Sequence, residues 1–143
     1  MEKKYELTED TTEVKGKTLH RIKALKDFGF VKKDDLGGYV ESESNLSQTG
    51  ECWISDDAKV YDNAYVSGDA GVNHNAEIFD NAEISDDAAV FDNVKVYGNG
   101  KVMDYAEVRG NAEIYDEACV SDDAYVYGNA KIYGRGSVSG VFI

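Results

Sequence analysis

The sequence predicts an all-β fold, a parallel β-solenoid of triangular cross-section that follows a small N-terminal β cap. Three observations predict it. An aliphatic residue recurs every six positions from Ile54 to Val138 without a miss. A small residue, usually alanine, stands four positions after almost every one of them. Charges of opposite sign alternate at positions eighteen apart, which a three-sided coil would stack.

Each six-residue unit divides into an extended part and a corner. In Ala58-Lys59-Val60-Tyr61 the alternation of a β-strand sends Ala58 and Val60 inward and Lys59 and Tyr61 outward. The next two residues, Asp62-Asn63, are turn formers that tolerate a left-handed backbone. Three such sides close a coil of eighteen residues, so residues 54–143 predict about five coils at ~4.8 Å per coil.

An outward column of alternating charge supports three sides per coil. Its members are Lys59, Glu77, Lys95, Glu113 and Lys131. Opposite charges on adjacent strands contribute roughly 0.2–1 kcal/mol each, and like charges cost a similar amount. The alternation is absent at a spacing of six and present at eighteen.

The pattern of an aliphatic residue, a short turn and a small residue four places on resembles the hexapeptide-repeat left-handed β-helices throughout residues 54–143. The resemblance implies a single-stranded left-handed parallel β-helix, a triangular solenoid of 18 residues per coil and about five coils. The usual crossover preference would predict the opposite hand. Right-handed solenoids, including bactofilins and pentapeptide-repeat proteins, are the alternative, although a five-residue period is excluded.

Residues 1–53 lack the six-residue period and predict an N-terminal cap with an imperfect first coil. The segments 4–7 and 18–25, around Lys15-Gly16-Lys17, predict a β-hairpin or meander. Residues 36–46 then begin an irregular coil. The stretch LKDFGFVKKDDLGGYVESESNLSQTGECWI resembles the N-terminal part of bacterial and prophage hexapeptide-repeat proteins, some labelled putative transferases. That resemblance implies lineage more than function.

The negative net charge of the chain reduces the number of functions that the sequence allows. The formal net charge is -13, and residues 54–143 hold seventeen Asp/Glu against six Lys/Arg. A direct nucleic-acid ligand is excluded because phosphate binding needs basic side chains, so we expect a basic protein partner. No apolar run approaches a membrane span, and Cys52 and Cys119 form neither a disulfide framework nor a zinc pattern. We therefore expect a location in the cytoplasm of a bacterial host cell, without membrane contact.

Two stacked surfaces are candidate binding sites. The first, called the aromatic flank, consists of Tyr61, Phe79, Tyr97, Tyr115 and Tyr133. The second, called the acidic edge, consists of Asp69, Asp86, Asp87, Asp104, Asp122 and Asp123. Six carboxylates over four coils, about 19 Å, give one charge per roughly 3 Å, close to the ~3.4 Å spacing of one DNA strand. Such an edge could imitate a phosphate backbone, bind Ca²⁺ through its oxygens, or simply be a solvated corner.

The apolar C-terminus is a candidate for contact between copies. Val141, Phe142 and Ile143 end the sequence without a capping helix, so they predict either self-coverage or end-to-end pairing in a homodimer. The aromatic flank is the other candidate for a homodimer contact.

An enzyme is the minority interpretation. Many hexapeptide-repeat proteins are trimeric acyltransferases with a catalytic histidine and a loop that leaves the coils, but residues 54–138 carry no insertion. His20 and His74 have no evident orienting partner, and no catalytic residue, metal ligand set or cofactor motif is identified. We therefore expect a non-catalytic acidic solenoid that binds protein, in the sharpest form a phage-derived inhibitor of a host nucleic-acid-binding defence protein by charge mimicry. A self-assembling structural protein and an acyltransferase are the alternatives.

Overall fold

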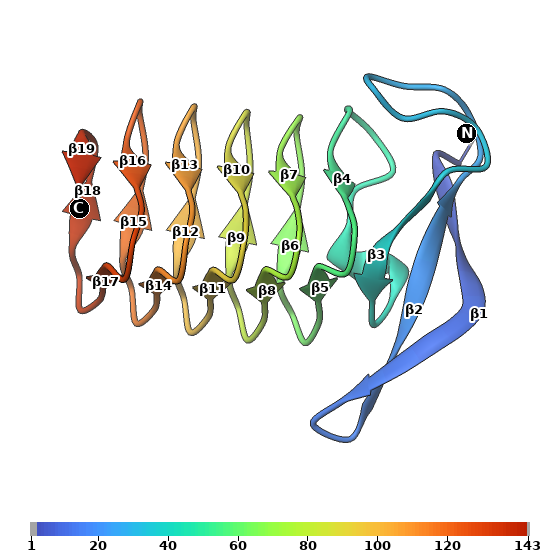
Figure 1. The fold of residues 1–143 in the computed structure, drawn as a ribbon, viewed down its shortest axis with the longest axis horizontal. Coiled ribbons are helices and arrows are strands. Elements are labelled where there is room, and N and C mark those ends of the chain that lie inside the picture. Colours follow the sequence, from blue (N-terminus) through green and yellow to red (C-terminus); the bar gives the residue numbers. More distant parts are fainter. Residues whose placement is uncertain (1–2, 143) are drawn as a thin grey trace.

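The computed structural model describes residues 3–142, with side chains for residues 3–140, and shows a long solenoid with a β-hairpin at its N-terminal end (Figure 1). All strands from β3 onward pair in parallel, and the chain winds as the expected left-handed β-helix. The end-to-end contact expected at Val141, Phe142 and Ile143 lies outside the described residues, because it depends on their side chains. No helix in residues 3–142 is long and apolar enough to cross a membrane.

Three sheets form the walls of the solenoid. The first sheet contains the hairpin strands β1 (Tyr5–Val14) and β2 (Lys17–Ala24), then β3 (Leu36–Val40), β5 (Lys59–Val60), β8 (Glu77–Ile78), β11 (Lys95–Val96), β14 (Glu113–Ile114) and β17 (Lys131–Ile132). The second sheet contains β4 (Trp53–Ile54), β7 (Gly71–Val72), β10 (Ala89–Val90), β13 (Glu107–Val108), β16 (Tyr125–Val126) and β19 (Val141–Phe142). The third sheet contains β6 (Tyr65–Val66), β9 (Glu83–Ile84), β12 (Lys101–Val102), β15 (Cys119–Val120) and β18 (Ser137–Val138).

The coils stack with the predicted offset of eighteen residues. Lys95 pairs with Glu77 on one side and with Glu113 on the other, so the alternating charge column runs along the outside of the first sheet. Backbone hydrogen bonds join the coils at every side and corner, as from Lys95 N to Ala112 O at 3.1 Å. The predicted period and column are therefore confirmed.

The inward positions form one continuous core. The repeating aliphatic residues, for example Val60, Val66 and Val72, are fully buried, and the alanines four positions later, such as Ala64, are buried beside them. The corner residue that follows each strand adopts a left-handed backbone, as at Asp62 (φ 59°) and Gly98 (φ 61°). Aspartate and glycine are among the few residues that tolerate this conformation, which explains their prevalence at the corners.

The first coil is longer than the others. Val40 pairs with Val60 and Leu46 with Val66, twenty residues apart, whereas Trp53 pairs with Gly71, eighteen apart. A short 3₁₀ helix, η1 (Glu43–Asn45), lies on the six-residue side from Val40 to Leu46, and the two extra residues lie in the loop between Leu46 and Trp53. This coil precedes the five expected ones, so the solenoid has about six turns.

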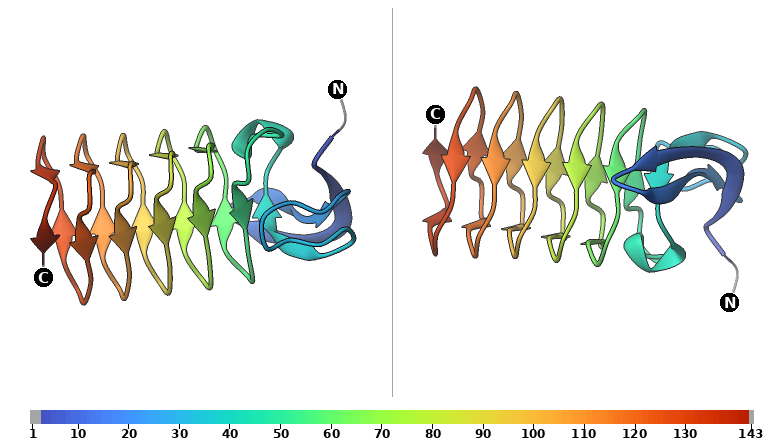
Figure 2. Two further views of the ribbon diagram at one scale, coloured as in Figure 1. Left: turned by 90° about the horizontal axis from the view of Figure 1, so that it is seen from above. Right: turned by 90° about the horizontal axis from the view of Figure 1, so that it is seen from below.

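The N-terminal cap is a twisted hairpin that covers the open end of the core (Figure 2). Strand β2 pairs antiparallel with β3, and β1 extends through the polar residues 8–13, beyond the short segment that the sequence predicted. Tyr5 and Ile22 of the hairpin join the core cluster. The close packing of the first coil requires glycine, because a Cβ at Gly37 would lie 2.5 Å from the Ile54 carbonyl oxygen.

The charge column gives a test of the stacking. In Lys95→Glu, three carboxylates would adjoin along the first sheet, whereas Lys95→Gln removes only the two attractions. We expect the free energy of unfolding to fall by about 1–2 kcal/mol for Lys95→Glu and by less than about 1 kcal/mol for Lys95→Gln. Urea unfolding at low and high salt measures this, and the difference between the variants should shrink at high salt. Equal stability of the two variants at low salt would contradict the stacking of these charges.

Candidate functional site

The acidic edge lies at the corner between the third and second sheets, where each coil turns from one strand to the next (Figure 1). Each coil contributes two corner residues. Asp86, Asp104 and Asp122 stand at the first corner position and have φ between 57° and 59°. The structure thus brings the six predicted aspartates onto one edge, and Glu51 extends the edge by one coil.

The first-position aspartates hydrogen-bond to the next coil. An oxygen of Asp86 accepts from the backbone N–H of Asp104 at 3.1 Å, and an oxygen of Asp104 accepts from that of Asp122 at 2.9 Å. The same contact recurs at the other corners, for example from Gly110 N–H to Asp92 at 2.9 Å. These carboxylates therefore hold coils together as well as carrying charge, which the sequence did not reveal.

The second-position residues Asp87 and Asp123 are exposed, and within residues 3–142 their carboxylates accept no hydrogen bond from a neighbouring coil. Asp69 accepts a hydrogen bond from the backbone N–H of Glu51 at 3.0 Å. Within residues 3–142, no carboxylate of the acidic edge forms an ion pair, and neither does Glu51. For the alternative of Ca²⁺ binding, the described residues contain no group of three His, Cys, Asp or Glu side chains that could hold a metal ion.

A groove that the sequence analysis missed opens at the N-terminal end of this edge. It measures about 450 Å³ and is lined by Phe30, Trp53 and Gly71 together with the carboxylates Glu51, Asp69 and Asp87. Phe30 is fully exposed at the tip of a tight turn in which Phe28 and Val31 exchange backbone hydrogen bonds of 2.9 and 2.7 Å. The ring of Phe28 packs edge-on against Trp53 at 5.3 Å. The Phe-Gly-Phe sequence was the available signal for this feature.

A buried lysine lies beneath the same end of the edge. The ammonium group of Lys4 donates to the Cys52 carbonyl oxygen at 2.8 Å and lies 3.3 Å from the Cys52 sulfur. Burial lowers the pKa of Lys4 and raises the pKa of the Cys52 thiol. This contact anchors β1 to the first coil and supports the groove from within.

The aromatic flank forms the predicted stack. Successive rings lie 5.0–5.6 Å apart and within 14° of parallel. The rings lie outside the inner core, as expected, but Tyr61 is fully buried and Phe79 is only 9% exposed, because Val14 and Leu19 of the hairpin pack over them. Burial and a hydrogen bond to Glu113 raise the pKa of Tyr97 to about 12. Exposure increases away from the hairpin and reaches 60% at Tyr133.

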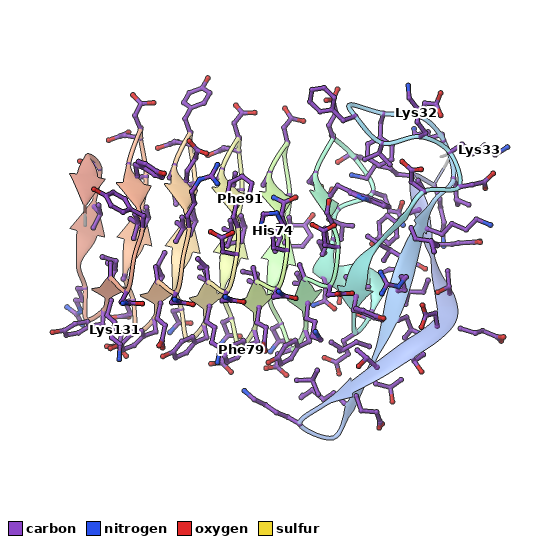
Figure 3. The ribbon with its side chains drawn as sticks, in the orientation of Figure 1. Lys32, Lys33, His74, Phe79, Phe91 and Lys131 are labelled. Atoms are coloured by element: carbon purple, nitrogen blue, oxygen red, sulfur yellow. The ribbon has the colours of Figure 1, made fainter. Side chains whose placement is uncertain are left out.

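The two histidines lie far apart in the fold, His20 in the N-terminal hairpin and His74, labelled in Figure 3, at a corner of the coils. His20 lies on β2, and its Nδ1 is 3.0 Å from the Thr8 carbonyl oxygen of β1. His74 replaces aspartate at the first position of a corner (φ 61°), and its Nδ1 lies 3.1 Å from the backbone N–H of Asp92. That corner forms an open polar groove of about 680 Å³ with asparagines on the successive coils.

No protein-family model matches this chain, and no curated protein matches it significantly in sequence.

Replacing an aspartate at the first corner position should lower the free energy of unfolding more than replacing one at the second position. Asp104→Ala removes the acceptor for Asp122 N–H and places alanine in a left-handed conformation, so we expect a loss of about 1–3 kcal/mol in the free energy of unfolding. Asp123→Ala removes the same charge without either cost, and we expect a change of about 0.5 kcal/mol or less. Chemical denaturation of both variants measures the difference. Equal effects would mean that the corner hydrogen bond does not stabilise the stack.

The corners also predict acid sensitivity. The hydrogen bond from the Gly110 N–H lowers the pKa of the Asp92 carboxyl group below its ordinary value. A carboxyl group whose pKa is lowered by folding stabilises the protein above the unfolded pKa, and this contribution is lost as the pH falls through the folded value. We therefore expect urea stability to fall as the pH drops below about 4. Asp92→Asn, which keeps an acceptor oxygen, should show a smaller decrease; an unchanged pH profile in this variant would refute the assignment.

Proposed function

We propose that this protein is a non-enzymatic binding scaffold that presents the acidic edge to a basic groove of another protein. The observation that carries the proposal is the uniform sign of the edge. Each coil from Glu51 to Asp123 offers at least one carboxylate there, and no lysine, arginine or histidine shares the corner positions. Unpaired surface charges of one sign attract a partner of opposite charge and speed its association.

The spacing of the charges supports a groove that ordinarily holds nucleic acid. Five coils at ~4.8 Å each span about 24 Å and carry seven carboxylates, one per roughly 3 Å, against ~3.4 Å between phosphates of one DNA strand. The hydrogen bonds to the backbone fix the orientation of Asp86 and Asp104. A preformed row of charges loses little conformational freedom on binding.

The groove beside Trp53 lies at the N-terminal end of the acidic edge and could bind one side chain of the partner. Glu51, Asp69 and Asp87 surround an aromatic wall, which is an environment that suits the flat guanidinium of an arginine. A basic groove that follows the edge would place one arginine there and further cations along Asp104 and Asp122. The resemblance that the sequence analysis drew between residues 25–54 and prophage proteins is an untested expectation, and it directs the proposal to a nucleic-acid-binding defence protein of a bacterial host.

The test is a displacement experiment. A fluorescent DNA duplex is bound to each of a panel of purified bacterial DNA-binding proteins, and the full chain is added at low and at high salt. We expect release of the duplex from at least one protein at low salt, and a weaker effect at high salt. The triple variant Asp69→Asn, Asp87→Asn and Asp123→Asn should be about tenfold less effective.

The matched control removes three carboxylates from the exposed side of the hairpin. Glu6→Gln, Glu9→Gln and Glu13→Gln change the net charge equally, and these residues stand on β1 and not at a corner of the coils. Displacement should be nearly unchanged in this variant. Equal losses in both triple variants would show a response to net charge alone, and no displacement from any protein of the panel would reject charge mimicry.

A further inference from the structure

The hairpin tip shows what kind of segment the aromatic flank binds. The ammonium group of Lys15 lies 4.1 Å from the centre of the Phe79 ring and 5.9 Å from that of Tyr61. Lys17 forms an ion pair of 2.6 Å with Oδ1 of Asp62. Leu19 is buried against both rings. Two lysines and a leucine therefore cover two stacked rings and one corner carboxylate.

The repeat places the same groups again three coils further on. Tyr115 and Tyr133 lie 54 residues after Tyr61 and Phe79, and stack at 5.6 Å. Asp116 stands 54 residues after Asp62 in the same left-handed corner conformation, with φ of 57° against 59°.

The two corner carboxylates are held in the same way. Oδ2 of Asp62 accepts from the backbone N–H of Asp80 at 3.1 Å, and Oδ2 of Asp116 accepts from that of Gly134 at 2.9 Å. Oδ1, the atom that binds Lys17 at the first position, has no hydrogen-bond or ion-pair partner at Asp116 in the described chain. The carboxylate is thus oriented as at the site that the hairpin covers.

The surroundings of the second set differ in the placing of the charges. Lys131 takes the place of Glu77 beside the rings, and Glu117 takes the place of Asn63 at the corner. At the same offset Glu113 replaces Lys59, Gly134 replaces Asp80 and Arg135 replaces Asn81. Each set therefore has three carboxylates near its ring pair, although Glu117 also forms an ion pair of 3.0 Å with Arg135. In Figure 3 the labelled Phe79 and Lys131 lie along the same side of the solenoid, on the outside of the first sheet.

We propose that Tyr115, Tyr133 and Asp116 form a docking surface for a lysine-bearing hairpin or extended segment of another protein. The argument for a lysine-bearing segment is the protein's own hairpin, whose Lys15 and Lys17 contact the equivalent ring and carboxylate, Phe79 and Asp62. The occupant is not the hairpin of a second copy, because that hairpin already covers Tyr61 and Phe79 of its own chain. The surface is separate from the acidic edge, so this inference does not depend on the function proposed above.

The probe is a cyclic peptide of residues 11–20 in which Thr11→Cys and His20→Cys form a disulfide that closes the hairpin. It is titrated into the isotope-labelled full chain, and the amide signal of Gly134 and the ring signals of Tyr115 and Tyr133 are followed by NMR. We expect saturable shifts at these positions. A peptide with Lys15→Gln and Lys17→Gln should bind about tenfold more weakly.

Two protein variants locate the binding. Asp116→Asn keeps the corner hydrogen bond and loses the charge, and should weaken binding of the peptide several-fold. Asp104→Asn makes the same change on the acidic edge and should leave binding unaltered. The proposal is overturned if the shifts are absent up to the solubility limit of the peptide, if they centre on the acidic edge, or if both variants weaken binding equally. A dimer of the chain that Asp116→Asn dissociates would assign the surface to a second copy and likewise overturn it.

Discussion

Backbone hydrogen bonds between successive coils, each from an N–H to the carbonyl oxygen seventeen residues later, are the interaction on which the structure depends. Tyr97 donates to the carbonyl oxygen of Ile114 at 2.9 Å, and equivalent bonds join successive coils on all three walls. Each strand from β4 to β19 is only two residues long, so no single wall of these coils would be stable alone. The stack of coils supplies the core and also aligns like side chains in columns. Every surface described above is a consequence of that alignment.

The corners show how charge and stability are combined in the same residues. The left-handed backbone restricts the first corner position to aspartate, glycine and one histidine over residues 56–134. Aspartate is the better choice where another coil follows, because its carboxylate accepts the next corner N–H, as at Asp92. A solenoid built in this way becomes acidic as it gains stability. The negative charge of the protein is thus in part structural, whereas the exposed carboxylates of Asp87 and Asp123 accept no such hydrogen bond in the part of the chain that the structure describes.

The repeat was predictable because it is local: each aliphatic residue, turn and alanine contributes to the same period, so the columns of Tyr97 and Lys95 follow from counting. The cap was not predictable in detail. The docking of Lys15 and Leu19 on Phe79 joins segments distant in sequence, and no periodicity signals it. The groove at Phe30 was missed for the same reason, since it depends on a loop that meets the second sheet. The hydrogen bonds of the acidic edge follow from backbone conformation, which composition alone does not give.

The most direct measurement of the central claim is a set of proton–proton contacts in the NMR spectrum of the full chain. Stacking at eighteen residues predicts contacts of the Tyr97 ring with the rings of Phe79 and Tyr115, and contacts of the Leu19 methyl groups with Tyr61. Ring contacts at another residue offset would contradict the alignment of the columns. A Tyr61 ring in contact with water and not with Leu19 would contradict the packing of the hairpin on the aromatic flank.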